Sequence, residues 1–183
     1  MRFYILLFAL LAFGTKSIAQ NDQINWITMN EALAAQKKEP KKIMIDMYTN
    51  WCGPCKLLDK NTFQNKDVAD YVNKHYYAVK FNAEGKEAVT YKDKNYGNPK
   101  YIEGKTGRNN QHELAVHFGI TAYPTVLFLD EEAKPISPVK GYHQPKGFEV
   151  YLKVFATDDY KKITTQEQFQ KYIKEFKHEF KVE

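Results

Sequence analysis

The chain has 183 residues, of which 43% are hydrophobic, so it is long enough to bury the core of one domain without cross-links. Its 27 basic and 22 acidic residues give a formal net charge of +5. The lysines are spread along the chain with acids between them, as on an ordinary solvated surface. This pattern argues against nucleic acid as a partner.

The first 19 residues have the pattern of a secretory signal peptide. Arg2 gives a short basic end, residues 3–13 form an apolar run, and the SIA sequence at 17–19 offers small residues for cleavage. The run is shorter than the roughly 18 residues that an uncleaved membrane anchor requires. We therefore expect cleavage after Ala19 and export to the periplasm or cell envelope. No later stretch is apolar enough to cross a membrane.

Apolar runs of strand length alternate with helical patterns through the rest of the chain. The predicted strands are 26–29, 41–49, 76–83, 124–130 and 135–141, the last an edge strand. The predicted helices are 30–37, 55–63, 67–76, 110–119 and 146–156, with Asn65 and Asn110 as caps and Gly119 as a stop. This order predicts an α/β fold in which a central mixed sheet is flanked by helices.

Two segments stand outside that alternation. Residues 84–109 form an insertion before the third core helix, with a possible hairpin at 89–96, and such a length without structure is unusual. Because it leaves the end of a strand, it could shape a substrate groove. A solvated decoration is at least as well supported, and a lysine–tyrosine surface for nucleic acid is the weakest interpretation.

The last segment, 158–183, follows a domain expected at 20–157 and is predicted to be a helical extension. Thr165 and Gln168 match a capping box. Beyond them, the apolar residues at positions 169, 173, 176 and 180 are predicted to form one stripe on that helix. Stripes of this kind usually pack on their own domain, and a partner-binding helix is the minority interpretation.

Cys52 and Cys55 are the only cysteines in the chain. A disulfide between them would close a very small ring, which constrains the unfolded chain little. A zinc site normally needs four ligands, and the histidines show no ligand spacing around this pair. We therefore rank redox chemistry first, a structural disulfide second and metal binding last.

The cysteines lie where the predicted strand 41–49 ends and a helix begins. Pro54 suits the first turn of a helix, where unpaired N–H groups and a partial positive charge favour a thiolate. Cys52, outermost on the turn, is expected to be exposed and to be the attacking nucleophile. Cys55, inside the first turn, is expected to be more buried and to resolve the mixed disulfide.

The segment IMIDMYTNWCGPCK at 43–56 resembles the active-site segment of thioredoxins. A second segment, GITAYPTVLFLD at 119–130, resembles the thioredoxin turn in which a cis-proline, here Pro124, precedes a strand and faces the cysteines. The resemblance covers residues 24–157 and implies a thioredoxin fold. The segments that follow the cysteines look more like the periplasmic thioredoxin-like domain of bacterial transmembrane thiol:disulfide interchange proteins.

Two positions depart from the thioredoxin pattern. Lys60 stands where thioredoxins carry the proline that kinks the active-site helix, and Tyr123 stands where they carry Ile before the cis-proline. Because position 123 borders the disulfide, the redox potential cannot be transferred from thioredoxins to this chain.

The resemblance also implies roles for residues around the cysteines. Asp46 would be the buried carboxylate that acts as a base for Cys55, with Lys80 near it on the neighbouring strand. Substrate contacts are implied for a further set: Trp51, Gly53, Pro54, Tyr123, Pro124 and Gly141. An ordinary turn glycine is an equally good interpretation of Gly141.

These residues predict a thiol–disulfide oxidoreductase of the cell envelope. No cofactor is needed, since the two electrons reside in the cysteines. The expected partners are protein disulfides and a membrane electron donor. The Gly53-Pro54 pair favours a reductase or an interchange protein, a disulfide oxidase or isomerase is the alternative enzyme, and a client-binding chaperone-like module is the alternative outside enzymes.

Overall fold

The computed structural model describes residues 23–181, so the predicted signal peptide at 1–19 lies outside the described residues. Five strands form the central sheet, in the order β1-β3-β2-β6-β7. Strand β2 pairs in parallel with β3 and antiparallel with β6, which confirms the predicted mixed sheet. The strands of this sheet are β1 Trp26–Ile27, β2 Lys42–Tyr48, β3 Tyr76–Asn82, β6 Thr125–Leu129 and β7 Pro135–Lys140.

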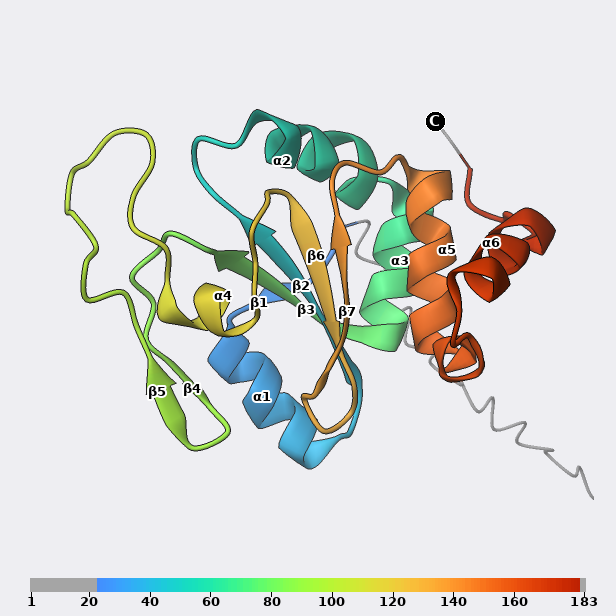
Figure 1. The fold of residues 1–183 in the computed structure, drawn as a ribbon, viewed down its shortest axis with the longest axis horizontal. Helices are drawn as coiled ribbons and strands as arrows, with labels where there is room; N and C mark the ends of the chain where they lie inside the picture. Colours follow the sequence, from blue (N-terminus) through green and yellow to red (C-terminus); the bar gives the residue numbers. More distant parts are fainter. Residues whose placement is uncertain (1–22, 182–183) are drawn as a thin grey trace, which may run out of the picture.

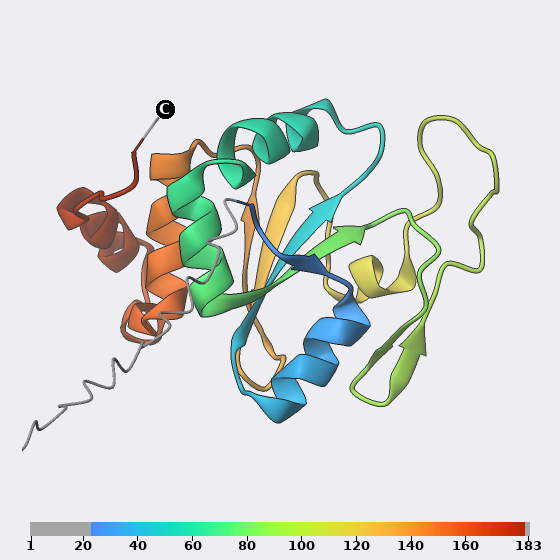
Figure 2. The same cartoon turned by 180° about the vertical axis from the view of Figure 1, so that it is seen from behind.

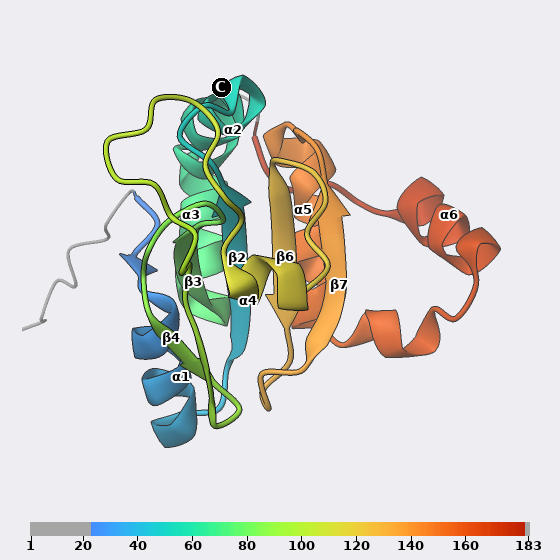
Figure 3. The same ribbon diagram turned by 60° about the vertical axis from the view of Figure 1, so that its left-hand side comes forward.

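Helices cover both faces of the sheet (Figures 1 and 3). Alternate residues of β2 face opposite layers, as the pleat of a strand requires: Met44 packs with α3 and α5, and Ile45 with α1 and α4. The helices are α1 Met29–Lys38, α2 Gly53–Leu58, α3 Lys66–His75, α4 Glu113–His117, α5 Pro145–Ala156 and α6 Gln166–Glu175. Among residues 23–181, no helix has the length and apolar character needed to cross a bilayer.

One predicted helix start is confirmed to within one residue, and another was wrong. The first helix begins at Met29, one residue before its predicted start, because the side chain of Thr28 accepts the Glu31 N–H in a capping box. The helix predicted at 110–119 is shorter in the structure, where α4 spans Glu113–His117. Its N-cap is His112, whose Nδ1 accepts the Leu114 N–H. Asn110 instead donates its side-chain N–H to a loop carbonyl.

The active-site helix changes its winding without a proline. After α2, the chain continues as a π-helix over Asp59–Phe63, which includes the position of Lys60. A π-helical segment is rare and often accompanies a functional site. Here it brings Asp59 to Lys80 of β3, with 2.5 Å between Oδ1 and Nζ.

The predicted hairpin in the insertion is present, as β4 Val89–Tyr91 and β5 Lys94–Tyr96. Tyr91 and Tyr96 are buried with residues of α1 and α4, so the hairpin belongs to that core. Between β5 and α4, a long loop extends beside the loop that joins β2 to α2 (Figures 1 and 2).

The tail differs from the predicted single helix. The capping box at Thr165 and Gln168 is present, but α6 ends at Glu175, after a short 3-10 turn at Asp159–Lys162. Residues 176–181 form no helix or strand, so the predicted apolar stripe is not continuous. Phe180 is buried in the core cluster of α3 and α5, where the Glu149 carboxylate accepts its backbone N–H.

Candidate active site

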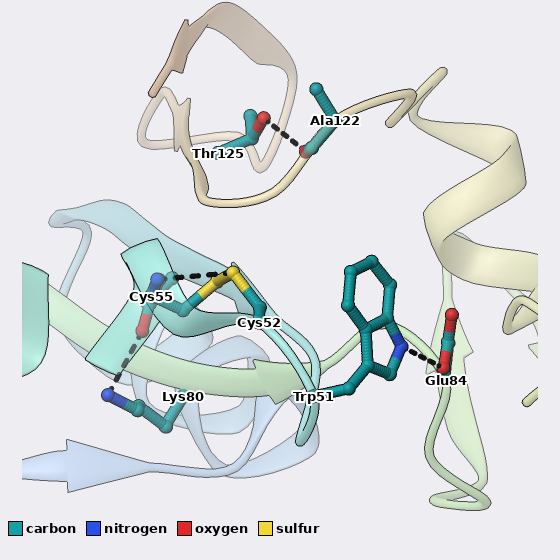
Figure 4. Close-up of a disulfide and its surroundings, with 8 residues drawn as sticks. Trp51, Cys52, Cys55, Lys80, Glu84, Ala122 and Thr125 are labelled. Carbon is teal, nitrogen blue, oxygen red and sulfur yellow. Dashed lines mark hydrogen bonds and ion pairs between the residues drawn. A yellow bond between two sulfur atoms is a disulfide. The ribbon is translucent and has the colours of Figure 1, made fainter. Parts of the chain in front are cut away.

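Cys52 and Cys55 form a disulfide at the point where the β2–α2 loop enters α2. Cys52 is the N-cap of that helix, and its Sγ accepts the Cys55 N–H at 3.1 Å (Figure 4). Pro54 occupies the start of the helix, as predicted. The sulfur of Cys52 therefore lies where a helix offers an unpaired donor to a negative group.

The expected exposure of Cys52 was wrong for this disulfide form. The exposed fraction is 2% for Cys52 and 5% for Cys55. The bond to Cys55 and the N–H contact hold the Cys52 sulfur against the helix start, and Gly53 and Pro54 form the exposed tip of the turn.

Beneath the helix, three charged residues form one cluster. Asp46 of β2 lies directly opposite Lys80 of β3, with 3.0 Å between Oδ2 and Nζ, and Lys80 also pairs with Asp59. Asp46 is 1% exposed, and no described residue donates a hydrogen bond to its Oδ1. Burial raises the pKa of Asp46 to about 6, although Lys80 opposes this shift. Burial lowers the pKa of Lys80, but Asp46 and Asp59 outweigh it, so that pKa is raised.

A small cleft of about 170 Å³ lies between two members of this cluster, Asp59 and Lys80, and Cys55. Its lining includes Cys55, Asp59 and Lys80, together with residues of the β2–α2 loop. Figure 4 shows the cysteines with Lys80 on one side and the loop of Ala122 and Thr125 on the other. Polar groups that can exchange a proton with Cys55 therefore line the same cleft as that residue.

Trp51 connects the cysteines with the insertion. Its indole Nε1–H donates to Glu84 Oε2 at 2.8 Å (Figure 4), and its ring meets Tyr123 edge-on, with 6.0 Å between centroids. The guanidinium of Arg108 lies 4.4 Å from the ring centroid. The backbone N–H of Asn109, next to Arg108, donates to the same Glu84 oxygen at 2.7 Å, so Glu84 connects Trp51 with the insertion loop.

The loop before β6 carries the remaining predicted contacts. The Tyr123–Pro124 bond is cis, as predicted. Gly141 lies against this turn, since its N–H donates to the Pro124 carbonyl at 2.8 Å. Its φ of 90° is in the region that favours glycine, so a larger residue would strain the loop. The hydroxyl of Tyr123 accepts a hydrogen bond from Gln111.

The structure thus gathers all ten predicted residues around one end of the sheet. Sequence reasoning missed Asp59, Glu84 and Arg108. Asp59 follows Cys55 by four residues, so helical spacing could have placed it below the pair. Nothing in the local pattern indicated that Arg108 would contact Trp51. Among the described residues, no cluster of three or more His, Cys, Asp or Glu could hold a metal ion.

Comparison with known proteins agrees with this arrangement. The family model of the thioredoxin-like domain matches residues 29–156. The thiol:disulfide interchange protein DsbD of Pseudoalteromonas atlantica is 28% identical over 127 residues, which are 67% of this chain and 17% of that protein. The chain therefore matches only about a fifth of the length of such relatives.

Solved structures support the fold. A thioredoxin-fold protein from Helicobacter pylori superposes with a TM-score of 0.59 at 20% identity, covering 86% of this chain and 93% of that one. A candidate disulphide isomerase from Bacteroides thetaiotaomicron superposes with a TM-score of 0.51 at 29% identity, covering 76% and 98%. The expected thioredoxin fold is confirmed.

Proposed function

Because this chain belongs to the thioredoxin-like family, we propose that it reduces protein disulfides in the cell envelope through Cys52 and Cys55. The observation that carries the proposal is the place of Cys52 as the N-cap of α2, with its Sγ accepting the Cys55 N–H. The same donor and the start of the helix would stabilise a thiolate there, and the thiolate is the reactive form.

In the first step, the Cys52 thiolate attacks one sulfur of a substrate disulfide. A bond forms between Cys52 and that sulfur, the substrate disulfide breaks, and the other substrate sulfur leaves as a thiolate. The turn at Pro124 and the ring of Trp51 border the site of attack and are proposed to receive the substrate backbone and side chains.

In the second step, Cys55 resolves the mixed disulfide. Its thiol loses a proton, its sulfur attacks Cys52 Sγ, and the second substrate thiolate leaves. The pair is oxidised and the substrate gains two electrons. We propose Asp46 as the group that accepts the proton, with Lys80 linking it to the cleft beside Cys55. A carboxyl with a pKa of about 6 suits proton transfer near neutral pH.

A reductase must be re-reduced before each new turnover. We propose a membrane protein with a reduced dithiol as the electron donor, in keeping with the signal-peptide pattern at 1–19 and the similarity to thiol:disulfide interchange proteins. The Gly53-Pro54 pair supports the reducing direction, because thioredoxins, which are reductants, carry the same pair. Since Tyr123 also borders the disulfide, the potential of this chain is itself one of the measurements below.

Four measurements test this function. Reduced protein should be alkylated at Cys52 before Cys55, the Cys55→Ser variant should accumulate mixed disulfides with protein substrates, and equilibration with glutathione should give a potential below about −230 mV. Cys52→Ala should abolish disulfide reduction. Alkylation of Cys55 first would reverse the two roles, a potential near −120 mV would indicate an oxidase, and retained client holding by Cys52→Ala would indicate a chaperone-like module.

A further inference from the structure

The long loop of the insertion is held in a defined shape by asparagine side chains. Asn98 donates to the carbonyls of Gly85 and Asn110, at 3.0 and 2.7 Å. Asn109 exchanges two hydrogen bonds with the backbone of Ile102, at 3.0 and 2.8 Å. These bonds fix the shape of the loop, which lies beside the β2–α2 loop, while most of its residues stay exposed to solvent (Figures 1 and 2).

This loop places a cation next to the reactive cysteines. Arg108 is exposed, and its guanidinium stands over the Trp51 ring that precedes Cys52. A guanidinium can stack on an indole and still donate in its own plane to a carboxylate, whereas a lysine ammonium acts as a point charge. Arg108 is therefore held in place while its outward N–H groups stay available to a partner.

Two further basic side chains lie at the same end of the sheet as the cysteines, one beside Cys55 and one beside the loop that leads to Pro124. Lys56 is exposed, follows Cys55 in α2 and lines the cleft beside it. Lys140 is exposed at the end of β7, where its Nζ lies 3.4 Å from Thr121 Oγ1 on the loop that leads to Pro124. The surface around the disulfide thus receives positive charge from α2, from β7 and from the insertion.

The nearby acidic groups have partners within the protein. Asp59 is paired with Lys80, and one oxygen of Glu84 accepts the N–H groups of both Trp51 and Asn109. Both carboxylates are engaged by donors within the protein, whereas the exposed side chains named above are cationic. Such a charge distribution attracts an acidic partner and repels a basic one.

We propose that Arg108, Lys56 and Lys140 form a docking surface for an acidic segment that flanks the reactive cysteine of the partner protein. The proposal rests on the proposed function and adds the class of partner. Arg108 is the main specificity determinant, because it alone is fixed on the ring next to Cys52. A carboxylate bound at Arg108 would hold the partner disulfide near the attacking sulfur.

The test uses reduced full-length protein carrying Cys55→Ser, so that only mixed-disulfide formation is measured. Three disulfide-linked peptides of equal length have their cysteines flanked by Asp and Glu, by Ser and Gln, or by Lys. Rate constants should fall in that order, with acidic and basic peptides differing about tenfold or more at low salt. The difference should nearly vanish at about 1 M salt, where the Debye length is about 3 Å.

Charge reversal then identifies the residue responsible. Arg108→Glu should invert the order of the acidic and basic peptides, and Arg108→Lys should keep the order with a smaller ratio. Lys92→Glu is the matched control, since Lys92 also lies over a ring of the insertion, that of Tyr91, but on the β4–β5 turn. It should leave the ratio as in the parent protein.

The outcomes separate this proposal from the proposed function. Hydroxyethyl disulfide, which is small and uncharged, serves as the reference substrate. If it reacts but the three peptides react at equal rates, or if Lys92→Glu changes the ratio as much as Arg108→Glu, the docking surface is refuted and the oxidoreductase function stands. If neither the reference nor any peptide reacts, both proposals fail.

Discussion

Asp46 and Glu149 are both carboxylates with almost no exposure, 1% and 0%, yet their environments differ. Asp46 has one ion pair, to Lys80, and an oxygen without a described donor. Glu149 of α5 pairs with Lys153 at 2.8 Å, and its oxygens accept the backbone N–H groups of residues 179 and 180. Burial raises the pKa of Asp46 to about 6, whereas at Glu149 the same effect is outweighed by these donors, which lower the pKa.

The comparison shows that the number of donors, and not burial alone, decides what a buried carboxylate does. Glu149, whose two oxygens both accept hydrogen bonds, stays charged and holds the tail to α5. Asp46, which has an oxygen without a described donor, can take up a proton near neutral pH, and such a shifted pKa is a property of functional sites. Four predictions test these two carboxylates and the tail that Glu149 holds, and they are given from the largest expected effect to the smallest.

Glu149→Ala should lower the free energy of unfolding by about 3 kcal/mol at pH 7, because Lys153 and two backbone N–H groups lose their acceptor. Since the pKa of Glu149 is lowered in the folded protein, its stabilisation is present above the ordinary value of 4.5 and disappears as the pH falls further. Urea unfolding at pH 7 and at pH 3 measures both effects. Glu149→Gln keeps an acceptor and should lose less, while a loss below about 1 kcal/mol for Glu149→Ala would contradict this structural role.

Phe180→Ala should lower the free energy of unfolding by about 3 kcal/mol, because it leaves a cavity in the core cluster to which the tail contributes. Phe176→Ala is the control, since Phe176 is only half-buried and should cost less. Urea unfolding of both variants checks the order. Equal losses would mean that the tail is held by its polar contacts to Glu149 and not by Phe180.

Asp46→Asn should stabilise the fold by about 2 kcal/mol at pH 8. The folded pKa of about 6 lies above the ordinary 3.8, so the folded protein binds the proton more tightly than the unfolded chain. The cost of the charged form therefore develops as the pH rises from about 4 to 6 and stays constant above that range. Unfolding curves at pH 4 and 8 should show the gain only at pH 8. A gain of equal size at both pH values would exclude ionisation of Asp46 as its cause.

Asp46→Asn should also slow resolution of the mixed disulfide about tenfold at pH 7, while its formation changes less than twofold. Formation depends on the Cys52 thiolate, whereas resolution requires Cys55 to lose its proton. Stopped-flow reduction of a protein disulfide resolves the two steps. Glu149→Gln serves as the control and should leave both rates unchanged. If Asp46→Asn slows both steps equally, Asp46 is not the base for Cys55.

Local sequence patterns were sufficient to predict a strand or a helix cap wherever the deciding interactions join residues that are close along the chain. The apolar run of β2, the Asn65 cap of α3 and the capping box before α6 were all predicted, because each depends on neighbours along the chain. The cysteine pair at a strand-to-helix junction was recognised for the same reason.

Only the tertiary structure decided how distant segments meet the cysteines. The stacking of Arg108 on Trp51 joins positions 57 residues apart through a loop without periodicity, so no local rule could place it. The 2% exposure of Cys52 was likewise not indicated by its place in the turn. The sequence determined the elements and the reactive pair, because their signals are short-range. The opposite pKa shifts of Asp46 and Glu149 depend on which donors and charges folding brings near, and so only the packed structure could establish them.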